Sequence, residues 1–586
     1  MKRNYIGLAS TFHDSALAIV NSKGDIVFAE ATERYLQYKK SLGISPDVFF
    51  RIGKLIRQYC EPDAELVLAH SWSENEVDFL RRELEEFHQK ERDVIAHFEG
   101  EVPYFIHREL ENRKFQLNAF ITGLEQATNT LVYELSRQED LFGTKIDTRR
   151  YDHHLCHAAA SCFSSPYEEA VCAIIDGEGE MGRASDLYHY KDGRLERFGD
   201  LPRQRNGSLG DFFSLVCQAC GFGVLTGEEW KVMGLAPYGK LDEDYYKLLK
   251  TVVIPNGLEL DGANNAQYSK VLWELYSNQR KPDEHPLKSA DLAHTGQRVF
   301  SDVVLEHLRN LHATGASNNL VLGGGCALNS SVNGQIVNET DFESLYVFCA
   351  PADDGNAIGA ALLAYYEDHP QSKPSTQVQI PYLGSEMSEL TFDYLKKFGQ
   401  IDRMKEYPNG TVCDKAAELL SEGKIIGWVQ GRAEFGPRAL GNRSILADPR
   451  TAAIKDEINS RVKFREEFRP FAPSILHEHG PDYFENYQDS PYMERTLIFK
   501  KEVHDKVPGV VHANGTGRLQ SVKKELNERY YNLINAFYQR TGVPVVLNTS
   551  FNIMGKPIIH SVEDAVAVFY TTGLDALIIG DLVIEK

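Results

Sequence analysis

The sequence lacks any apolar run of about 18 residues, which is the length that a membrane-spanning helix requires. Near its start, Lys2 and Arg3 precede the apolar letters YIGLAS, but His13 and Asp14 interrupt that stretch too early for a secretory signal. We therefore expect a cytoplasmic protein with no membrane partner.

Basic residues are also fewer than acidic ones. The 63 Lys and Arg residues are outnumbered by 84 Asp and Glu residues, which gives a formal net charge of −21. Nucleic acid and anionic membranes attract basic surfaces, so this charge disfavours both as partners. Small-molecule substrates are the expected alternative.

A disulfide framework is missing as well. The nine cysteines are scattered without a pattern, which is typical of a reducing compartment. The one close pair, Cys217 and Cys220, lies in an apolar helical stretch and has no second pair to complete a zinc site. We therefore expect this pair to pack in a core rather than to bind zinc or to react.

What the chain does contain is a repeated structural plan. Residues 5–35 read as a strand, a turn, a second strand and a hairpin into a third strand, and residues 170–200 repeat this order. Helical segments follow both copies. The repetition predicts a duplicated α/β fold of the actin and hexokinase type, in which the first turns of both copies face a nucleotide across a cleft.

A chain of 586 residues is too long for one ordinary core, so we expect more than one domain. We place an actin-like domain at 1–368, a proline-containing linker at 369–385 and a second α/β domain at 386–586. The expected elements of the second domain are helices near 388–399 and 412–423 and strands in KIIGWVQ, VPVVLNTS and ALIIGDLVIE. The charge-rich helical segment 74–140 fits either a solvated amphipathic face or a lid over a substrate.

The stretch LVLGGGCALNSSVNG predicts a nucleotide site. A strand runs into Gly323–Gly325, and a helix is expected from about Cys326. Glycines let the backbone approach a ligand, and the amides at a helix start attract phosphate. The alternative is a tight strand-to-helix turn without a ligand. Two other glycine-rich stretches fail as phosphate loops: GEGEMG leads into a strand, and GLAPYGKL has Leu241 where magnesium binding needs Ser or Thr.

The stretch YDHHLCHAAASCF places His153 and His157 on one face of a helix. Alone, this spacing fits a packed helix at least as well as a metal site. Two acidic residues at the ends of strands, Asp176 and Asp353, change the balance because a duplicated cleft fold would bring them to the same place. Two imidazoles and two carboxylates suit Fe(II), Zn(II) or Mn(II).

The densest basic signal lies between Arg432 and Arg469. This segment holds seven Arg and two Lys against six Asp or Glu, although the whole chain is acidic. Phenylalanines and prolines interleave with the charges, which indicates a partly buried surface rather than a solvated basic face. Arginine forks in an apolar setting suit phosphate and carboxylate-like groups. Farther along the chain, Arg518, Asn548, Ser550 and Asn552 add polar contacts.

Several motifs make the chain similar to the NodU/CmcH family of O-carbamoyltransferases. They are FHDSALAIV, HHLCHAAAS, DGEGE, GEEWKVMGLAPYG, GGGCALN, DDGNAIGAAL, EFGPRALGNRSILADPR, VKFREEFRPFAPS, HANGTGRLQ and LNTSFN. The resemblance covers nearly the whole chain. It implies an actin-like domain related to tRNA threonylcarbamoyl-transfer proteins, followed by a domain that resembles the YrdC family.

The resemblance also implies two reactions. In the second domain carbamoyl phosphate and ATP, as its Mg²⁺ complex, form carbamoyladenylate. In the first domain the carbamoyl group passes to a hydroxyl of a small natural product. The family pattern departs at Gln37, and residues 60–150 match it poorly, so the resemblance does not identify the acceptor.

The matching positions imply specific roles. The resemblance assigns the carbamoyl phosphate pocket to Arg438, Lys463, Arg469, Arg518, Asn548 and Ser550. It assigns Fe(II), or another divalent metal, to His153, His157, Asp176 and Asp353. The nucleotide is assigned to Lys39, Gly324, Gly325, Asn329 and Asp176. His13 faces the acceptor as the expected base, and Arg438 and Lys463 are the other expected catalytic residues.

Other functions share parts of this pattern. Carbamoyladenylate also serves the modification of tRNA and of a hydrogenase-maturation protein, although the acidic charge and the missing zinc-finger cysteines argue against these two. A non-enzymatic, actin-like ATP-dependent scaffold would leave the arginine-rich segment without a purpose. A homodimer is the expected assembly if the chain associates.

Overall fold

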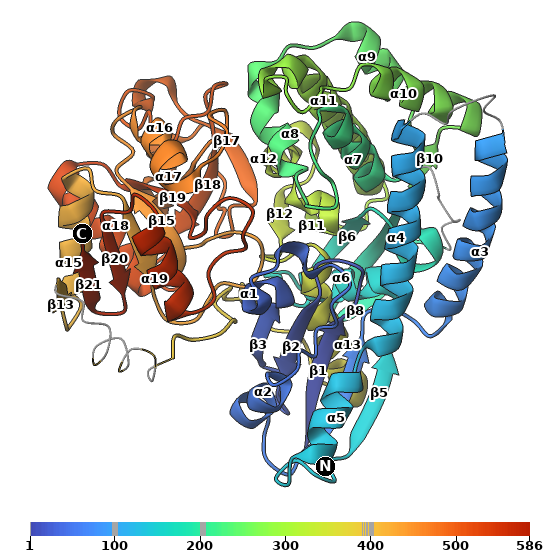
Figure 1. Cartoon of the computed structure of the whole chain (residues 1–586), viewed down its shortest axis with the longest axis horizontal. Helices are drawn as coiled ribbons and strands as arrows, with labels where there is room; N and C mark the ends of the chain where they lie inside the picture. The colour runs from blue at the N-terminus through green and yellow to red at the C-terminus, as the bar shows by residue number, and fades with distance from the viewer. Residues whose placement is uncertain are drawn as a thin grey trace.

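The computed structural model describes residues 2–96, 104–199, 207–388, 391, 393, 397 and 403–586. The N-terminal part of the chain forms the right-hand lobe of Figure 1, and the C-terminal part forms the left-hand lobe. Among the described helices, none combines the length and the apolar character needed to cross a bilayer.

The N-terminal lobe contains two five-stranded sheets with the same topology. The first has the order β3-β2-β1-β4-β5, with strands β1 (Arg3–Ala9), β2 (Ala16–Val20), β3 (Ile26–Ala31), β4 (Glu65–His70) and β5 (Ile146–Arg150). The second has the order β12-β11-β6-β7-β8, with strands β6 (Glu169–Ile175), β7 (Ser185–Lys191), β8 (Arg194–Arg197), β11 (Asn319–Gly323) and β12 (Ser344–Val347). In each sheet an antiparallel meander is followed by two parallel strands. The predicted mixed α/β class and the duplication are confirmed.

Two helices pack against each other between these sheets, as Figure 1 shows: α6 (His153–Cys162) and α13 (Asn356–Asp368). Their contact is close because small residues meet there. A Cβ atom at Gly359 of α13 would lie 1.9 Å from the carbonyl oxygen of Cys156 on α6. Strand β1 packs on α13 as closely, because a Cβ atom at Gly7 would lie 1.7 Å from the carbonyl oxygen of Ala357. The close packing brings the start of α6 next to the turn that precedes α13.

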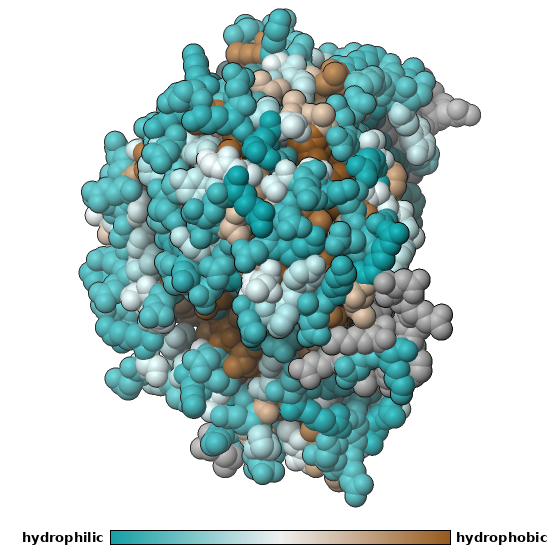
Figure 2. All heavy atoms as spheres, turned by 90° about the vertical axis from the view of Figure 1, so that its left-hand side faces the viewer, coloured by the Kyte–Doolittle hydropathy of each residue, from teal (hydrophilic) through white to brown (hydrophobic). Residues whose placement is uncertain are grey.

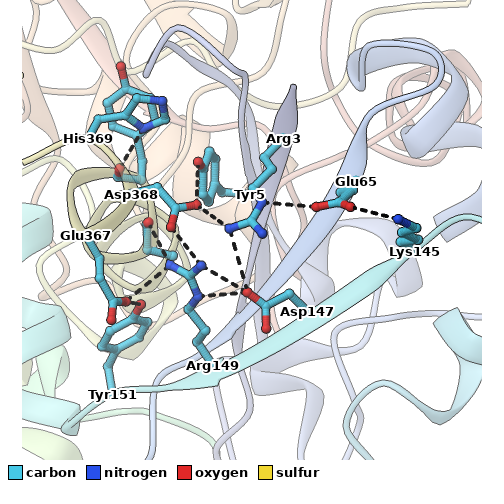
Figure 3. Close-up of polar contacts among 12 residues, drawn as sticks. Arg3, Tyr5, Glu65, Lys145, Asp147, Arg149, Tyr151, Glu367, Asp368 and His369 are labelled. Atoms are coloured by element: carbon cyan, nitrogen blue, oxygen red, sulfur yellow. Dashed lines mark hydrogen bonds and ion pairs between the residues drawn. The ribbon is translucent and has the colours of Figure 1, made fainter. Parts of the chain in front are cut away.

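The far end of α13 is anchored by ion pairs. Arg149 on β5 contacts Asp147, Glu367 and Asp368, and Figure 3 shows its guanidinium between these carboxylates. Asp368 also accepts hydrogen bonds from Arg3 and from the hydroxyl of Tyr5 on β1. This network fixes α13 against the first sheet at the edge opposite the cavity described below.

The charge-rich segment between β4 and β5 is helical as predicted. It forms α3 (Asn75–Ala96), α4 (Tyr104–Gln126) and α5 (Asn129–Arg137). The hairpin of α3 and α4 has a small core of its own, made of Trp72, Phe79, Leu80, Leu117 and Leu124. In Figure 1 this hairpin stands along the outer side of the N-terminal lobe.

The remaining N-terminal elements flank both sheets. They are α1 (Thr32–Leu36), η1 (Lys39–Ser41), α2 (Ile52–Tyr59), η2 (Glu180–Gly182), α7 (Leu209–Ala219), α8 (Trp230–Leu235), η3 (Ala236–Tyr238), α9 (Glu243–Leu249), β9 (Val253–Asn256), β10 (Glu259–Gly262), α10 (Asn265–Ser277), η4 (Pro286–Ser289), α11 (Ala290–His312), η5 (Gly325–Leu328), α12 (Ser330–Glu339) and η6 (Asp353–Gly355). Helix α2 packs against the first sheet, and α7, α8 and α11 pack against the second. Cys217 and Cys220 are both fully buried on and beside α7, in the core that this helix forms with α11.

The C-terminal lobe is built on one mixed sheet of nine strands in the order β13-β21-β20-β14-β15-β19-β16-β18-β17. These strands are β13 (Met404–Glu406), β14 (Ile426–Val429), β15 (Arg443–Ala447), β16 (Ala472–Leu476), β17 (Arg495–Ile498), β18 (Thr516–Val522), β19 (Val545–Ser550), β20 (Ala576–Ile579) and β21 (Leu582–Glu585). The helical elements are α15 (Thr411–Ser421), α16 (Ile454–Ile458), η7 (Asn459–Lys463), η8 (His477–His479), α17 (Gly480–Tyr483), η9 (Lys501–Val503), α18 (Glu528–Thr541) and α19 (Val562–Thr571). The predicted strands and the helix near 412–423 are present, whereas most of the predicted helix 388–399 lies outside the described residues.

The face of this lobe turned away from the N-terminal lobe is predominantly hydrophilic, and hydrophobic atoms show mainly in recesses between polar side chains (Figure 2). Residues 369–385, the predicted linker, contain neither helix nor strand. The two lobes are joined by direct contacts as well: Arg34 donates to the carbonyl of Gly436 at 2.7 Å, and Arg432 donates to that of Val27 at 2.8 Å. The exact domain boundaries stay a prediction.

Candidate active site

A cavity of about 1300 Å³ lies where the two lobes meet. Its walls come from the first turn of each N-terminal sheet, from the helices around them and from the strands of the C-terminal sheet. Most of the residues singled out in the sequence line it. The exceptions are His153, His157, Gly324 and Lys463, which lie directly behind its wall.

The four predicted metal ligands converge. His153 and His157 come from α6, whose first turn is capped by the Asp152 carboxylate, which accepts a hydrogen bond from the backbone N–H of Leu155. Nε2 of His157 lies 3.3 Å from Oδ2 of Asp176 and 3.5 Å from Oδ1 of Asp353, and Nε2 of His153 lies 3.4 and 3.6 Å from the same oxygens. One ligand atom from each residue falls within a 4.8 Å span.

The surroundings of this cluster fit a bound cation. The Nδ1 atom of His153 faces the side-chain amide of Asn356 at 3.3 Å, and the amide oxygen of Asn356 is buried without a partner among the described residues. If the side-chain oxygen and nitrogen of Asn356 exchange places, the oxygen accepts a hydrogen bond from Nδ1–H of His153. The lone pair on Nε2 of His153 is then available for a metal. The ring of His153 is also stacked on Trp72, with centroids 3.8 Å apart.

Electrostatics at the cluster favour positive charge. Burial alone lowers the pKa of His153, but hydrogen bonds to Asp176 and Asp353 outweigh it and raise this pKa to about 10. The pKa values of both carboxyl groups are lowered, because these two histidines outweigh the effect of burial. Two anionic carboxylates at this depth therefore require a compensating charge, either protons on the histidines or a divalent cation.

His13 lies next to this cluster. Its Nδ1 atom is 3.0 Å from Oδ2 of Asp14 and 3.8 Å from Oδ2 of Asp353. Lys40 donates to Asp14 at 2.6 Å, so Asp14 holds both side chains. Burial lowers the pKa of His13, yet the hydrogen bond to Asp14 raises it above its usual value. A histidine whose ring is held by a carboxylate is well placed to take a proton.

The predicted nucleotide residues lie along the same wall. Gly324 has φ = 85°, and a Cβ atom there would lie 2.3 Å from the carbonyl oxygen of Ile175, so only glycine fits. The backbone N–H of Gly325 donates to Asp176 at 2.9 Å and is therefore engaged with the metal cluster. Asn329 caps α12 and exchanges hydrogen bonds with Gln297. The α-helix begins at Ser330 rather than near Cys326, because Asn329 caps it there and a 3₁₀ turn precedes it.

On the opposite wall, three arginines face the cavity. Burial lowers the pKa of Arg518 to about 10, and burial with repulsion from Arg518 lowers that of Arg438. Arg518 has no hydrogen-bond partner among the described residues, and Arg438 has only a 3.4 Å bond to the carbonyl of Leu328. Arg469 contacts Glu466 at 3.3 Å and lies over the ring of Trp230. Cations with so few partners stabilise an anion that enters the cavity.

Asn548 completes this wall. Its amide nitrogen donates to Ala439, Ser474 and Gln520, while its oxygen is buried without a partner among the described residues. This oxygen is thus available to accept a hydrogen bond from an N–H group of a ligand.

Lys463 is arranged differently from the expectation. It is 2% exposed and donates to the side-chain oxygens of Ser550 and Asn552, at 3.3 and 2.7 Å, and to both of their backbone carbonyls. In this structure Lys463 therefore holds the end of β19 and the following turn, and Ser550 rather than Lys463 reaches the cavity.

Two cavity residues were not singled out from the sequence. Arg465 lies over the ring of Phe471 and has one guanidinium nitrogen buried without a partner among the described residues. His512 has a pKa lowered to about 3, first by burial and then by Arg518. Arg465 lies in the motif VKFREEFRPFAPS and His512 lies in HANGTGRLQ. The spacing within these motifs did not distinguish either residue from its neighbours.

Comparison with known proteins gives a consistent result. Residues 4–362 match the family model described as Carbamoyltransferase N-terminus, and residues 417–586 match the one described as Carbamoyltransferase C-terminus. The nodulation protein NolNO of Sinorhizobium fredii (strain NBRC 101917 / NGR234) is 34% identical over 100% of this chain and 80% of its own. An uncharacterised Synechocystis protein is 31% identical over 99% of this chain and 96% of its own.

A solved structure of full-length HypF in the phosphate- and nucleotide-bound form is similar to part of the chain. The two share 11% sequence identity with a TM-score of 0.34, and the match covers 62% of this chain and 46% of HypF. A likeness at this TM-score carries no argument.

Proposed function

The chain belongs to the carbamoyltransferase family and is a carbamoyltransferase enzyme, and from this premise we propose that it uses carbamoyl phosphate and ATP to carbamoylate a hydroxyl of a small natural product. One water molecule hydrolyses carbamoyl phosphate to carbamate and phosphate. The carbamate then attacks ATP, which forms carbamoyladenylate and releases pyrophosphate. The acceptor hydroxyl then takes the carbamoyl group and AMP leaves. Membership of an enzyme family removes the scaffold alternative, while modification of tRNA or of a maturation protein stays the alternative for the acceptor.

The arginine wall supports the adenylation step. Arg438, Arg469 and Arg518 bring positive charge to a largely desolvated surface where a phosphate or carbamate would be neutralised. The free oxygen of Asn548 suits the amino group of the carbamoyl moiety. Ser550 adds a hydroxyl that Lys463 orients through Asn552. Mg²⁺ would enter as the ATP complex.

The metal cluster supports the transfer step. His153, His157, Asp176 and Asp353 would hold the cation, for which we propose Fe(II), with Zn(II) or Mn(II) as alternatives. When bound, such a cation supplies Lewis-acid polarisation of a carbonyl or lowers the pKa of an alcohol. His13, held by Asp14, accepts the proton of the acceptor hydroxyl. Lys39 lies beside Trp230, where it would meet the adenylate.

One observation carries the proposal. The same cavity reaches from Arg518 and Asn548 on one wall to His13 and Asp353 on the other. An activated carbamate is prone to hydrolysis in water, so a short path within one cavity limits its exposure between the two steps.

We test the proposal by separating the two steps. Arg438→Ala removes a charged contact from the arginine wall. It should lower the carbamoyl-phosphate-dependent exchange of labelled pyrophosphate into ATP by about tenfold or more. Given preformed carbamoyladenylate, this variant should still consume it at the normal rate. Asp353→Ala should show the reverse: normal pyrophosphate exchange and little turnover of the adenylate.

Arg298→Ala serves as a matched control, because Arg298 is exposed on α11 and, within the described part of the chain, its one ion pair is with neighbouring Asp302. Each variant counts only if its melting temperature equals that of the wild type. If folded Arg438→Ala is equally slow with carbamoyl phosphate and with the adenylate, the assignment of the two walls is wrong.

A further inference from the structure

Beyond the metal cluster the cavity continues into a chamber walled by helices α3, α4, α7 and α10. Leu110, Arg113 and Leu117 line it from one face of α4, at spacings of three and four residues. Tyr268, Leu272 and Tyr276 line it from one face of α10 at spacings of four. Because each helix turns one face to the same space, this chamber is a built feature of the fold.

The chamber adjoins the reacting groups directly. Phe120 on α4 contacts Trp72 with centroids 4.7 Å apart, and Trp72 stacks on the metal-cluster residue His153 at 3.8 Å. Phe12, next to Phe120 at 6.4 Å, contacts the ring of His13 at 4.2 Å. A molecule in the chamber could therefore present a hydroxyl to His13 while its remaining part lies between the helices.

The walls are mostly apolar. Phe87, Leu110, Phe120 and Leu272 are only half-buried although they face the interior of the protein, and Phe213 stands on the wall of α7. Aromatic and aliphatic side chains left in contact with an interior space favour an apolar guest.

The charges in the chamber do not balance. Arg113 makes two bonds to Glu178, at 2.9 and 3.2 Å, and Glu109 pairs with Arg108 at 3.3 Å. Asp211, in the first turn of α7, has no side-chain partner among the described residues, and its side chain opens onto the cavity. Burial, followed by repulsion from Glu178, raises the pKa of Asp211 to about 7, and the nearby Arg113, which is itself bonded to Glu178, offsets this rise only in part. Proximity to a helix start accounts for an acidic residue there, but the carboxylate makes no hydrogen bond or ion pair of its own among the described residues, and it shares its one nearby cation, Arg113, with Glu178.

We propose that this chamber binds the body of the acceptor, and that the acceptor is a hydroxylated amphiphile whose apolar part carries a basic amine that pairs with Asp211. An ammonium group supplies the missing charge, and the aromatic walls stabilise it further through their π faces. A carboxylate-bearing acceptor would be repelled by Asp211 and Glu178. The inference rests on the proposed carbamoyl transfer for the identity of the reaction, but not for the binding itself.

The binding test uses simple probes in place of the acceptor. Calorimetric titration with n-octylamine, n-octanol and octanoate, at about pH 8 where Asp211 is largely ionised, measures the preference for a cation. Wild-type protein should bind octylamine about tenfold or more tightly than octanol and should bind octanoate least. Asp211→Asn should lose the preference for octylamine over octanol. Asp244→Asn, a matched change in the first turn of exposed α9, should keep it.

Leu272→Trp fills the chamber from α10 and should weaken octylamine and octanol alike. Melting temperatures establish that each variant is folded. Equal affinity of the wild type for all three probes overturns the inference, as does a folded Asp211→Asn that still prefers octylamine. So does undiminished octylamine binding by Leu272→Trp, because the probe would then bind elsewhere.

A second readout separates this inference from the proposed function. Carbamoyl-phosphate-dependent pyrophosphate exchange needs no acceptor, so its absence contradicts the proposed function while the octylamine result still decides the chamber. If pyrophosphate exchange occurs but the protein binds octylamine no more tightly than octanol, the proposed acceptor class is wrong and the proposed reaction stands. With both present, amino alcohols should be carbamoylated faster than diols of equal length, and Asp211→Asn should abolish that difference.

Discussion

At the scale of single residues, buried Lys463 and half-buried Arg518 behave in opposite ways. Lys463 donates to four oxygens of Ser550 and Asn552, whereas Arg518 has no partner among the described residues. We expect Lys463→Met to lower the free energy of unfolding by about 2–4 kcal/mol, because buried oxygens lose a charged donor. Arg518→Met should leave the melting temperature unchanged or raise it, yet lower pyrophosphate exchange by about tenfold or more.

Thermal unfolding and exchange, measured on the same preparations, test this contrast. Equal destabilisation by both substitutions would show that Arg518 is a structural cation after all. Conversely, a fully stable Lys463→Met that has lost exchange would return Lys463 to the role of a direct ligand contact.

The sequence identified the residue types of the site but not their directions. The spacing of His153 and His157 was sufficient to place both on one face of a helix. Which strand ends would meet them depended on the duplication, and so on a correct reading of two meanders. The orientation of Lys463 could not be predicted, because it is decided by the turn after β19, nearly ninety residues away in the chain.

At the scale of elements, the start of α3 is fixed to the turn that follows Asp176, one of the proposed metal ligands. Glu76 accepts from the backbone N–H of Met181 at 2.9 Å, and Glu180 accepts from Ser73. Burial and repulsion from Glu180 raise the pKa of Glu76 to about 8. A carboxyl of the unfolded chain titrates near pH 4.3, so between about pH 4.3 and 8 the folded state binds more protons.

The contribution of Glu76 to stability is therefore full at low pH and is lost as the pH rises through this window. Relative to the wild type, Glu76→Gln should gain stability with increasing pH, by at most about 1.4 kcal/mol per pH unit, and should be the more stable protein at pH 8. Glu111→Gln on the exposed face of α4 should follow the wild type. The free energy of unfolding of both proteins is measured from pH 5 to pH 8. If the wild-type and Glu76→Gln values change with pH in parallel, Glu76 is ionised when buried.

Elements with strong local signals were predictable. Glycine and Asp-Gly turns between apolar runs located the meanders, and helical periodicity located α3, α4 and α15. The choice between a solvated face and a substrate lid for 74–140 could not be made from periodicity, because α4 turns one side to the cavity and another to solvent. The structure places Leu110, Leu117 and Phe120 on the cavity wall, which favours a role at the substrate.

At the scale of the whole molecule, the lobes share one cavity and are held together beside it. Lys231 in the N-terminal lobe contacts Glu228 and, across the boundary, Glu466, both at 2.8 Å. We expect carbamoyladenylate to pass from one lobe to the other within the protein. When the donor is labelled carbamoyl phosphate, unlabelled carbamoyladenylate added to the solution should therefore lower the label in the product only slightly. Lys231→Met breaks the contact across the boundary and should increase that dilution several-fold without abolishing pyrophosphate exchange.

Lys288→Met, which removes only a surface pair with Glu284, controls for the loss of a lysine. Complete mixing of label in the wild type would mean that the intermediate leaves the protein between the steps. The sequence could indicate both chemistries but not their shared space, since the contacts between Arg34 and Gly436 and between Lys231 and Glu466 join residues more than two hundred positions apart.

The α3–α4 hairpin has a core of its own, in which Trp72 at its entry and Leu124 near its exit belong to the same small cluster. Its two ends thus lie close together, while Glu76 and Arg113 connect it to the turn after β6 and Trp72 connects it to α6. A segment whose ends lie close together can be exchanged between related chains while the arginines of the opposite wall stay in place, provided that the contacts of Trp72, Glu76 and Arg113 are kept. Grafting a relative's hairpin onto this chain should change which apolar bodies are accepted, while the preference for an amine, which depends on Asp211 of α7, should stay.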